Sequence, residues 1–157
     1  VGYGVEIDHE RVLGCIRNDV DVIQIDIERG LSGFEDHSFD HVIISQALQA
    51  MHATERILGE MLRVADEAVV SFPNFAYQTN RQAIASGHMP VSEDLPYEWY
   101  DTPNVRFFTI ADFEELCDKL GIEVRERLAF DDAGQPVADD PNLNGSLAFY
   151  RLGRKPA

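Results

Sequence analysis

The sequence lacks the features of an exported or membrane protein. It has two cysteines in 157 residues, and no apolar run approaches the roughly 20 residues that a membrane-spanning helix needs. No charged segment followed by an apolar stretch opens the chain, so nothing indicates export. We therefore expect a cytoplasmic protein. With 45% hydrophobic and 26% charged residues, 1–157 is expected to form a single domain.

The two cysteines favour unpaired buried thiols, with a single disulfide as the alternative. Cys15 and Cys117 each lie among apolar residues at helical spacing, where a free thiol behaves as a small hydrophobe. Neither lies in a nucleophile motif, and the five histidines show no metal-ligand spacing. The sequence thus predicts no metal site and no covalent catalysis, and it identifies no catalytic residue.

Positive charge is scarce as well. The chain has 13 lysines and arginines against 28 acidic residues, which gives a net charge of −15. Such a surface repels phosphate backbones and anionic lipid head groups. We therefore expect no binding to nucleic acid or membrane, and an acidity that mainly keeps the protein soluble.

The sequence does contain an alternation of strand-like and helix-like segments, which is typical of a parallel sheet covered on both faces. Strands are expected at 1–7, 20–27, 39–45 and 68–72. The apolar run Val42-Ile43-Ile44 favours a strand buried on both faces. Asp8 is expected to cap the helix after the first strand, and a second helix buries the apolar positions Ile57, Leu58, Met61, Leu62 and Val64.

The C-terminal third carries the clearest local signals. Thr109 and Asp112 are spaced as a capping box, and Gly121 is expected to end the helix that they begin. Strands follow within 122–130 and 147–152. The linker between them, 131–145, is too short for an ordinary crossover helix, so an antiparallel pair is expected.

The segment from about 75 to 108 fits neither a helical nor a strand period well. It is long for a connection, so we expect an insertion with an extra helix and a lid-like loop. It is rich in aromatic residues, which form either a second hydrophobic cluster or an exposed face that covers a substrate or docks a partner: Phe75, Tyr77, Tyr97, Trp99, Tyr100, Phe107 and Phe108.

Polar residues at the carboxyl ends of the strands mark the candidate site, because ligands bind there in open parallel sheets. Glu6 and Asp26 are separated by one strand–helix–strand unit and should end adjacent strands, and Ser45-Gln46 ends the third. The two carboxylates could accept from ribose hydroxyls and from a base amine. The alternative is that both are ordinary capping or loop acids. Gly2-Tyr3-Gly4 is not a phosphate loop, because no helix follows it.

Several segments carry a resemblance to a known family. Segments similar to those of class I S-adenosylmethionine-dependent methyltransferases are Gly4-Val5-Glu6-Ile7-Asp8, Asp26, Ser38-Phe39-Asp40 and Glu60-Met61-Leu62-Arg63-Val64. More specific segments resemble the methionine biosynthesis protein MetW family: Ser45-Gln46-Ala47-Leu48-Gln49, Val70-Ser71-Phe72-Pro73-Asn74-Phe75 and Trp99-Tyr100-Asp101-Thr102-Pro103-Asn104. The resemblance covers nearly the whole chain.

The resemblance implies an α/β fold, a three-layer Rossmann-like methyltransferase sheet with strand order 3-2-1-4-5-7-6 and an antiparallel last strand. It implies S-adenosylmethionine as cofactor, with Glu6 on the ribose and Asp26 near the adenine amine. The full set of expected cofactor-binding residues is Glu6, Ile7, Asp26, Ile27, Ser45 and Gln46. The family's first strand and glycine loop are absent from this chain, so residues 1–157 alone are expected to bind the cofactor weakly and to fold poorly.

Three functions remain open at this point. The resemblance implies a methyltransferase-fold protein of methionine biosynthesis that acts with homoserine O-acyltransferase. The first alternative is an active methyltransferase on a small molecule, in which positioning and desolvation of the acceptor supply the catalysis. The second is a non-catalytic interaction module.

Overall fold

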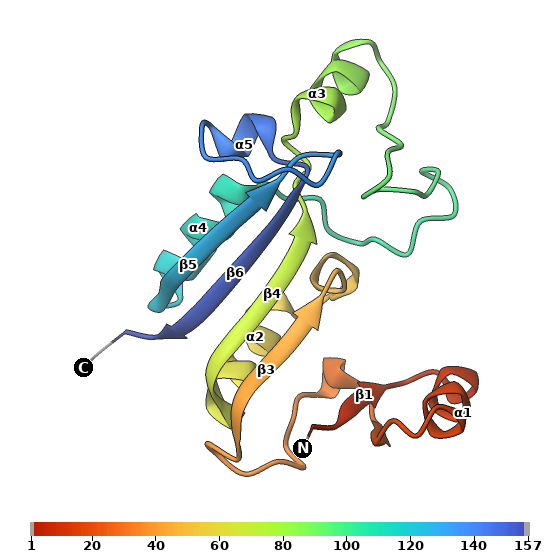
Figure 1. The fold of residues 1–157 in the computed structure, drawn as a ribbon, viewed down its shortest axis with the longest axis vertical. Coiled ribbons are helices and arrows are strands. Elements are labelled where there is room, and N and C mark those ends of the chain that lie inside the picture. Colours follow the sequence, from red (N-terminus) through yellow and green to blue (C-terminus); the bar gives the residue numbers. More distant parts are fainter. Residues whose placement is uncertain (1, 156–157) are drawn as a thin grey trace.

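The computed structural model describes residues 2–155 and shows an α/β fold with two groups of strands (Figure 1). Among those residues, every helix is too short or too polar to traverse a bilayer. In chain order the elements are β1 (Gly4–Glu6), α1 (His9–Arg17), β2 (Val22–Gln24), η1 (Ile27–Arg29), β3 (Phe39–Ser45), η2 (Leu48–Ala50), α2 (Thr54–Val64), β4 (Ala65–Pro73), α3 (Gln78–Ala85), α4 (Ile110–Lys119), β5 (Ile122–Phe130), α5 (Pro141–Asn144) and β6 (Leu147–Arg154).

The strands form a parallel pair, β1-β2, and a four-stranded sheet with the order β3-β4-β6-β5. β3 and β4 run parallel, with Ser45 opposite Ser71. β6 is antiparallel to both of its neighbours, which confirms the expected antiparallel last strand. Within each sheet the neighbours are those that the resemblance implies: β1 pairs with β2, and the larger sheet has the order β3-β4-β6-β5.

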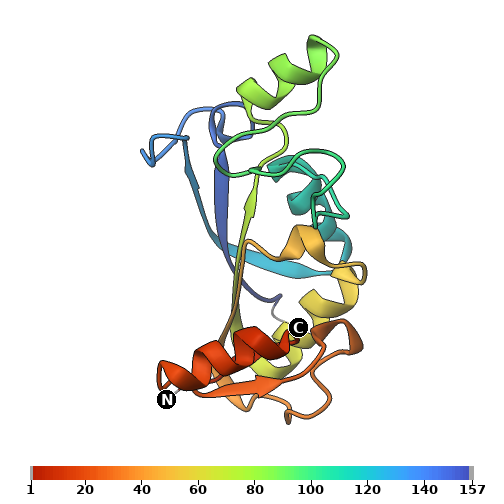
Figure 2. The same ribbon diagram turned by 90° about the vertical axis from the view of Figure 1, so that its right-hand side faces the viewer.

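The hydrophobic core lies on one face of the four-stranded sheet, under α2 and α4 (Figure 2). All five apolar positions predicted for α2 are buried. At the centre, the Phe72 ring lies 4.8 Å from Phe113 and 5.7 Å from Tyr150, between ring centroids. Such aromatic pairs add stabilisation beyond the area they bury, so this cluster locks β4 and β6 against α4.

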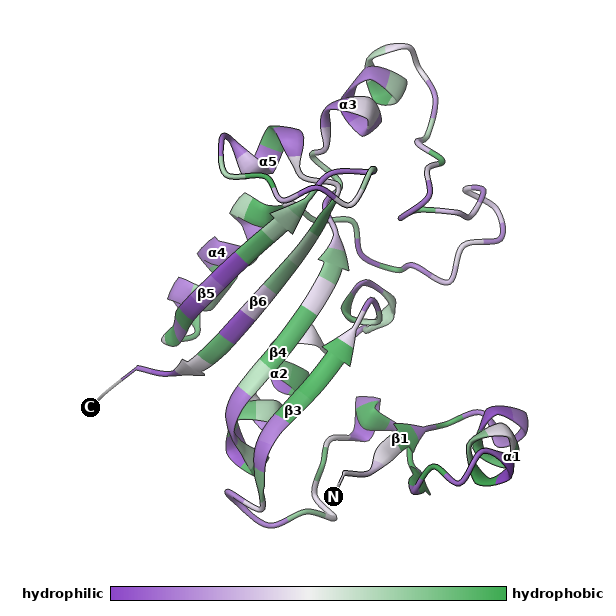
Figure 3. Cartoon of the chain, in the orientation of Figure 1, coloured by the Kyte–Doolittle hydropathy of each residue, from purple (hydrophilic) through white to green (hydrophobic). Residues whose placement is uncertain are grey.

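The opposite face of the sheet is more open, and the prediction that β3 is buried on both faces is wrong. Val42 and Ile44 pack against the core, but the Ile43 side chain between them is 68% exposed. β3 is therefore buried on one face only, because α2 and α4 both lie on the other side of the sheet. Figure 3 shows β3 as hydrophilic near its start and continuously hydrophobic in its second half, so the apolar run alone could not reveal which face is covered.

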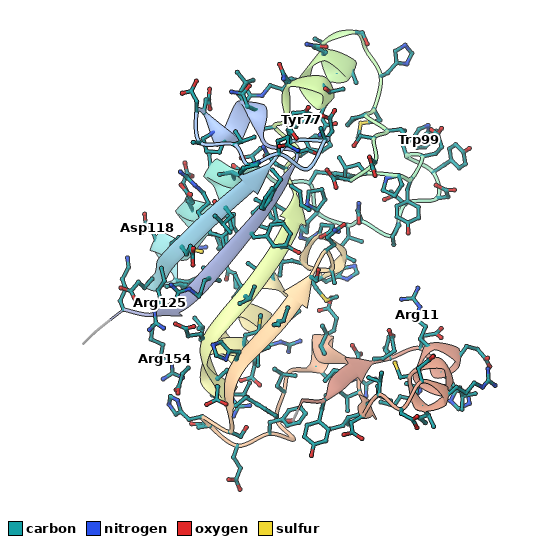
Figure 4. All side chains as sticks on the ribbon, in the orientation of Figure 1. Arg11, Tyr77, Trp99, Asp118, Arg125 and Arg154 are labelled. Carbon is teal, nitrogen blue, oxygen red and sulfur yellow. The ribbon has the colours of Figure 1, made fainter. Side chains whose placement is uncertain are left out.

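A charged cluster on this open face explains why the apolar pattern of β5 is irregular. The register of β5 against β6 shifts between Val124 and Glu126, which places Arg125 in a bulge. The Arg125 guanidinium donates to Glu67 on β4 and to Glu123, 3.1 Å away (Figure 4). A Cβ atom at Gly153 would collide with the Arg125 side chain, so glycine on β6 is what lets this arginine lie across the sheet.

The local capping predictions are confirmed. The Asp8 carboxylate accepts from the Arg11 amide at 2.9 Å and begins α1. Thr109 and Asp112 form a complete capping box at the start of α4. Gly121 follows α4 with a φ of +67°, a conformation that glycine adopts without strain.

The predicted strand boundaries agree less well with the structure than the predicted helix caps do. β1 and β2 have three residues each, fewer than the expected 1–7 and 20–27, and Val1 lies outside the described residues. β2 ends early because Asp26 caps the short helix η1 that follows it. β4 is longer than predicted and begins directly after α2.

The two thiols differ in burial, although both are free as predicted. Cys117 is fully buried in the core, whereas Cys15 on α1 is only half-buried. The prediction of two buried thiols is therefore wrong for Cys15. On α1 only Val12 is buried, and Ile16 is 58% exposed, so this helix covers little apolar surface.

This difference predicts selective alkylation of the folded protein. Burial raises the pKa of the Cys117 thiol to about 12, so little of the reactive thiolate forms there at neutral pH. Iodoacetamide is expected to modify Cys15 in the native protein and Cys117 only after unfolding in urea. Mass spectrometry of the labelled peptides measures this, and Cys15→Ser should remove the fast reaction. Equal labelling rates at both cysteines would contradict the packing described for α4.

Candidate functional site

Glu6 and Asp26 lie at the same edge of the parallel pair β1-β2. Glu6 ends β1 opposite Gln24, and the Ile25 amide donates to the Glu6 carbonyl at 3.2 Å. Asp26 follows Gln24 by two positions, directly before η1. Parallel strands present their carboxyl ends at one edge of the sheet, where ligands of such folds bind. The structure therefore places the two acids at the same edge of the strand pair, as predicted from the sequence.

The Glu6 carboxylate is held by local amides. Its Oε1 accepts from the amides of Ile7 and Asp8, each at 2.8 Å. Its Oε2 lies 3.8 Å from Arg11 Nη1, and the side chain is 24% exposed. One oxygen is thus fixed by the backbone while the other has no close donor among residues 2–155. This arrangement orients the carboxylate and leaves it capacity to accept from a ligand.

Asp26 is a capping residue, the role proposed as the alternative for both acids. Its Oδ1 accepts from the Glu28 amide at 3.0 Å, and its Oδ2 lies 3.4 Å from Arg29 Nε. Glu6 does not cap a helix, because Asp8 holds that position at α1. Of the apolar neighbours, Ile7 is 61% exposed, and Ile27 is half-buried as the first residue of η1.

Ser45 and Gln46 lie at the carboxyl end of β3. The Ser45 hydroxyl is 3.1 Å from the Ser71 hydroxyl on β4, and the Gln46 amide donates to the Ser71 carbonyl at 2.9 Å. Gln46 has a φ of +46°, in the left-handed region that few side chains adopt. Such strained residues persist where the surroundings hold them, and here Gln49 donates to the Gln46 carbonyl at 2.8 Å.

Glu28 links the two strand edges, a contact that the sequence analysis missed. Its carboxylate accepts from the His52 amide and, at 3.1 Å, from the Ala53 amide just before α2. The backbone hydrogen bond from His52 holds the pKa of Glu28 below its ordinary value. These contacts join the Asp26 edge to the connection that follows β3. No spacing signal could have revealed them, because the partners are far apart in the chain.

Glu60 and Arg63 fasten the segment after η1 to α2. Glu60 accepts from the Leu31 amide at 2.8 Å and from Arg63 Nε at 2.7 Å. Arg63 also donates to the carbonyls of Leu31 and Phe34, each at 3.0 Å. The family-like segment that contains both residues therefore positions the β1-β2 pair relative to the four-stranded sheet.

These contacts predict a loss of stability in acid. The hydrogen bond from Arg63 lowers the pKa of Glu60 from its ordinary 4.5. The same direction holds for Glu28 next to His52 and for Glu67 next to Arg125. A carboxylate with a depressed folded-state pKa stabilises fully above its unfolded pKa, and the stabilisation is lost as pH falls through the folded pKa. The free energy of unfolding should thus decline below about pH 4.5.

Urea unfolding between pH 7 and pH 3 measures this decline, and Glu60→Gln should flatten it. Glu115→Gln, on an exposed position of α4, is the matched control and should leave the slope unchanged. An equally steep decline in Glu60→Gln would contradict the role given to the Glu60–Arg63 pair.

A separate groove lies between the N-terminal ends of α2 and α4. Its volume is about 710 Å³, and residues 52–56, 106–108 and the α4 side chains Asp112, Phe113 and Leu116 line it. None of the predicted cofactor residues takes part. Glu28, which follows Asp26 by two positions, contacts the groove residues His52 and Ala53, but the groove and the Glu6–Asp26 edge have no lining residue in common and are separate candidate sites. Among residues 2–155, no cluster of histidine, cysteine and acidic side chains is arranged to hold a metal ion.

The aromatic segment around α3 divides into inward and outward residues. Tyr77 is buried and Phe108 packs against the core. Trp99 and Tyr100 are 71% and 70% exposed, and Trp99 projects from the long loop beyond α3 (Figure 4). Part of the set therefore belongs to a buried cluster, and the exposed part leaves the covering or docking role a prediction. The outward group, which we name the aromatic loop surface, comprises Tyr97, Trp99, Tyr100 and Phe107.

Comparison with known families gives a match over nearly the whole chain. The family model described as "Methionine biosynthesis protein MetW" matches residues 1–152. A bifunctional methionine biosynthesis protein MetXA/MetW from Rhodopirellula baltica is 40% identical over 96% of this chain. This chain spans only 26% of the length of that relative.

Solved structures share the fold at low identity. A S-adenosylmethionine-dependent methyltransferase from Thermotoga maritima, described as a possible histamine N-methyltransferase, is 19% identical with a TM-score of 0.70. The match covers 99% of this chain and 73% of that one. The cyclase SpnF is 18% identical with a TM-score of 0.65, covering 99% of this chain and 67% of the cyclase chain. The fold is therefore the Rossmann-like methyltransferase fold, which supports more than one chemistry.

Proposed function

Because this chain belongs to the MetW family of methionine biosynthesis proteins, we propose that it binds S-adenosylmethionine and acts with homoserine O-acyltransferase. The observation that carries the cofactor proposal is the placement of Glu6 and Asp26 at one edge of two adjacent parallel strands. Several structural relatives are themselves described as S-adenosylmethionine-dependent methyltransferases. When bound, this cofactor can supply an activated methyl group.

In this proposal each residue of the edge has a defined task. The Glu6 carboxylate, oriented by the amides of Ile7 and Asp8, accepts from the ribose hydroxyls. Asp26 lies near the adenine amine, and Ile7 and Ile27 supply apolar contact to the base. Ser45 and Gln46 approach from the end of β3. Hydrogen bonds that an ionised carboxylate accepts are among the stronger ones in proteins. Glu6 should therefore contribute most to the affinity for S-adenosylmethionine.

The same proposal includes a strand between β1 and β3. In the part of the chain that the structure describes, β1 pairs only with β2 and β3 pairs only with β4. Their other edges carry backbone groups without strand partners, and open edges of this kind pair readily with a further strand. We assign this place to the first strand of the family, whose glycine loop would wrap the methionine part of the cofactor.

The partner proposal rests on the fused relative and on the aromatic loop surface. The Rhodopirellula baltica relative bears the names MetXA and MetW in one chain, which places two functions in constant proximity. Exposed tryptophan and tyrosine side chains are typical anchors of protein interfaces. We therefore assign acyltransferase docking to the surface around Trp99 and Tyr100.

Methyl transfer to a small molecule is the second candidate, favoured by the likeness to the methyltransferase from Thermotoga maritima. Transfer of a methyl group needs no covalent residue, and positioning of the acceptor can supply much of the rate. The likeness to SpnF supports equally the use of this fold for other chemistry.

Titration calorimetry of the full-length protein with S-adenosylmethionine tests the cofactor proposal, and absence of binding would overturn it. Acyl transfer by homoserine O-acyltransferase, assayed with and without the protein, tests the partnership. Trp99→Ala should weaken co-purification of the two proteins, whereas Tyr3→Ala, at an exposed site near β1, should not. Labelled methyl transfer into a cell extract distinguishes the second candidate.

A further inference from the structure

The groove between α2 and α4 has an apolar floor and a cationic rim. Phe108 and Phe113 belong to the aromatic core cluster, and Leu116 extends the floor along α4. Arg56 on α2 and Arg106 on the loop before α4 lie at the rim, together with His52. A concave apolar surface with a few convergent charges is the usual form of a small-molecule site, and a volume of about 710 Å³ lies within the usual range.

The two arginines have no carboxylate partner within residues 2–155. Arg106 donates only to backbone carbonyls, to Val105 at 3.0 Å and to His52 at 3.1 Å. Arg56 forms no ion pair with any described acid. Acidic residues greatly outnumber basic ones in this chain, which has a net charge of −15. Arg56 lies close enough to Glu60 to help lower the pKa of that carboxyl, but Glu60 accepts its hydrogen bonds from Arg63 and from the Leu31 amide. Neither rim guanidinium therefore has to leave a close ion pair in order to bind an external anion.

The acids near the groove are already engaged in contacts of their own. Glu55 accepts from Lys119 at 2.9 Å, and Asp112 accepts from the Thr109 amide and hydroxyl in the capping box. Glu28, which faces His52, is bound to the His52 and Ala53 amides. These acids are therefore less able to neutralise the rim arginines.

The rim is also held in place by the backbone. The Gln49 carbonyl accepts from the amides of Val105 and Arg106, at 3.0 and 2.9 Å. Arg106 in turn reaches the His52 carbonyl, so the loop before α4 is fastened to the connection before α2. A rim fixed before binding loses little conformational freedom when a ligand arrives.

We propose that this groove binds a small amphipathic carboxylate. The acid group lies between Arg56 and Arg106, and a short apolar chain lies over Phe108, Phe113 and Leu116. This site is separate from the Glu6–Asp26 edge and does not depend on the cofactor proposal. Elsewhere the acidic surface repels anions, so the two arginines also concentrate the ligand at the groove.

NMR titration of the full-length protein with sodium hexanoate tests the proposal, with 1-hexanol as the uncharged probe of similar size. Hexanoate should shift backbone amides at 52–56 and 106–116, and hexanol should bind about tenfold more weakly, as expected when one charge-assisted hydrogen bond is lost. Arg56→Gln and Arg106→Gln should each weaken hexanoate binding by a similar factor. Arg17→Gln, at the exposed end of α1, should leave it unchanged.

Three results would overturn the proposal: no shifts at the groove, equal affinity for hexanoate and hexanol, or equal weakening by Arg17→Gln. Arg56 makes no ion pair with residues 2–155, so the Arg56→Gln protein should fold normally. If Arg106→Gln destabilises the loop before α4, Arg56→Gln still tests the proposal. Cofactor binding measured on the same variants should not change. A failure of this proposal is thereby distinguishable from a failure of the cofactor site.

Discussion

Replacing Asn74 by alanine is expected to lower the free energy of unfolding by about 3–5 kcal/mol, because several buried polar groups lose their partner. The Asn74 side chain is fully buried after β4. Its Oδ1 accepts from the amides of Ala76 and Ile110, both at 3.2 Å. Its Nδ2 donates to the carbonyls of Asn142 and Gly145, at 3.0 and 2.8 Å.

The size of this effect follows from the number of segments that meet at Asn74. Its contacts join the start of α4, the chain leading into α3 and the connection between β5 and β6. Alanine leaves two amides and two carbonyls without their side-chain partner, and all but the half-buried Asn142 carbonyl are closed to water. Each buried group left without a partner costs roughly 1–3 kcal/mol. Part of that cost is recovered by relaxation, which is why the expected total lies below the sum.

Equilibrium unfolding in urea measures the effect. Asn144→Ala is the matched control, because that amide makes one exposed hydrogen bond to the Asp139 carbonyl. The control should change the free energy of unfolding by less than about 1 kcal/mol. If Asn74→Ala changed the free energy of unfolding by a similarly small amount, the hydrogen bonds of Asn74 would not be what stabilises this end of the sheet.

Glu6→Gln is expected to weaken S-adenosylmethionine binding by roughly 10- to 100-fold, the range set by hydrogen bonds to a charged group. Glutamine keeps an oxygen that can accept from the amides of Ile7 and Asp8, so the local fold should persist. Asp26→Asn should have a smaller effect, because Asp26 already accepts from the Glu28 amide and asparagine can retain that bond.

Titration calorimetry on the full-length protein gives these affinities. Glu10→Gln, on an exposed position of α1 four residues away, is the control and should bind as tightly as the parent protein. Equal affinity of Glu6→Gln and the parent protein would remove Glu6 from the site.

The local parts of the fold could be predicted because their determinants lie close together in the sequence. Asp8 caps α1 by accepting from the amide three residues later, and Thr109 pairs with Asp112 over the same spacing. The placement of Glu6 and Asp26 followed from a parallel strand pair, which needs only one strand–helix–strand unit. These elements depend on interactions between residues close in the chain, which a single sequence is enough to predict.

Features that depend on distant contacts could not be predicted. The exposure of Ile43 is decided by which face α2 and α4 cover, and an apolar run does not encode that choice. The bond from Arg63 to the Leu31 carbonyl crosses 32 residues. The groove brings together Arg56 and Arg106 from segments fifty residues apart in the chain.

A double-mutant cycle between Glu6 and the ribose tests most directly whether this strand edge is the adenosine site. The affinities of the parent protein and of Glu6→Gln are measured for S-adenosylmethionine and for an analogue without the 2′- and 3′-hydroxyls. Removing the hydroxyls should weaken binding to the parent protein strongly and to Glu6→Gln hardly at all. An equal loss in both proteins would show that Glu6 does not contact the ribose, and would contradict the assignment of this edge as the adenosine site.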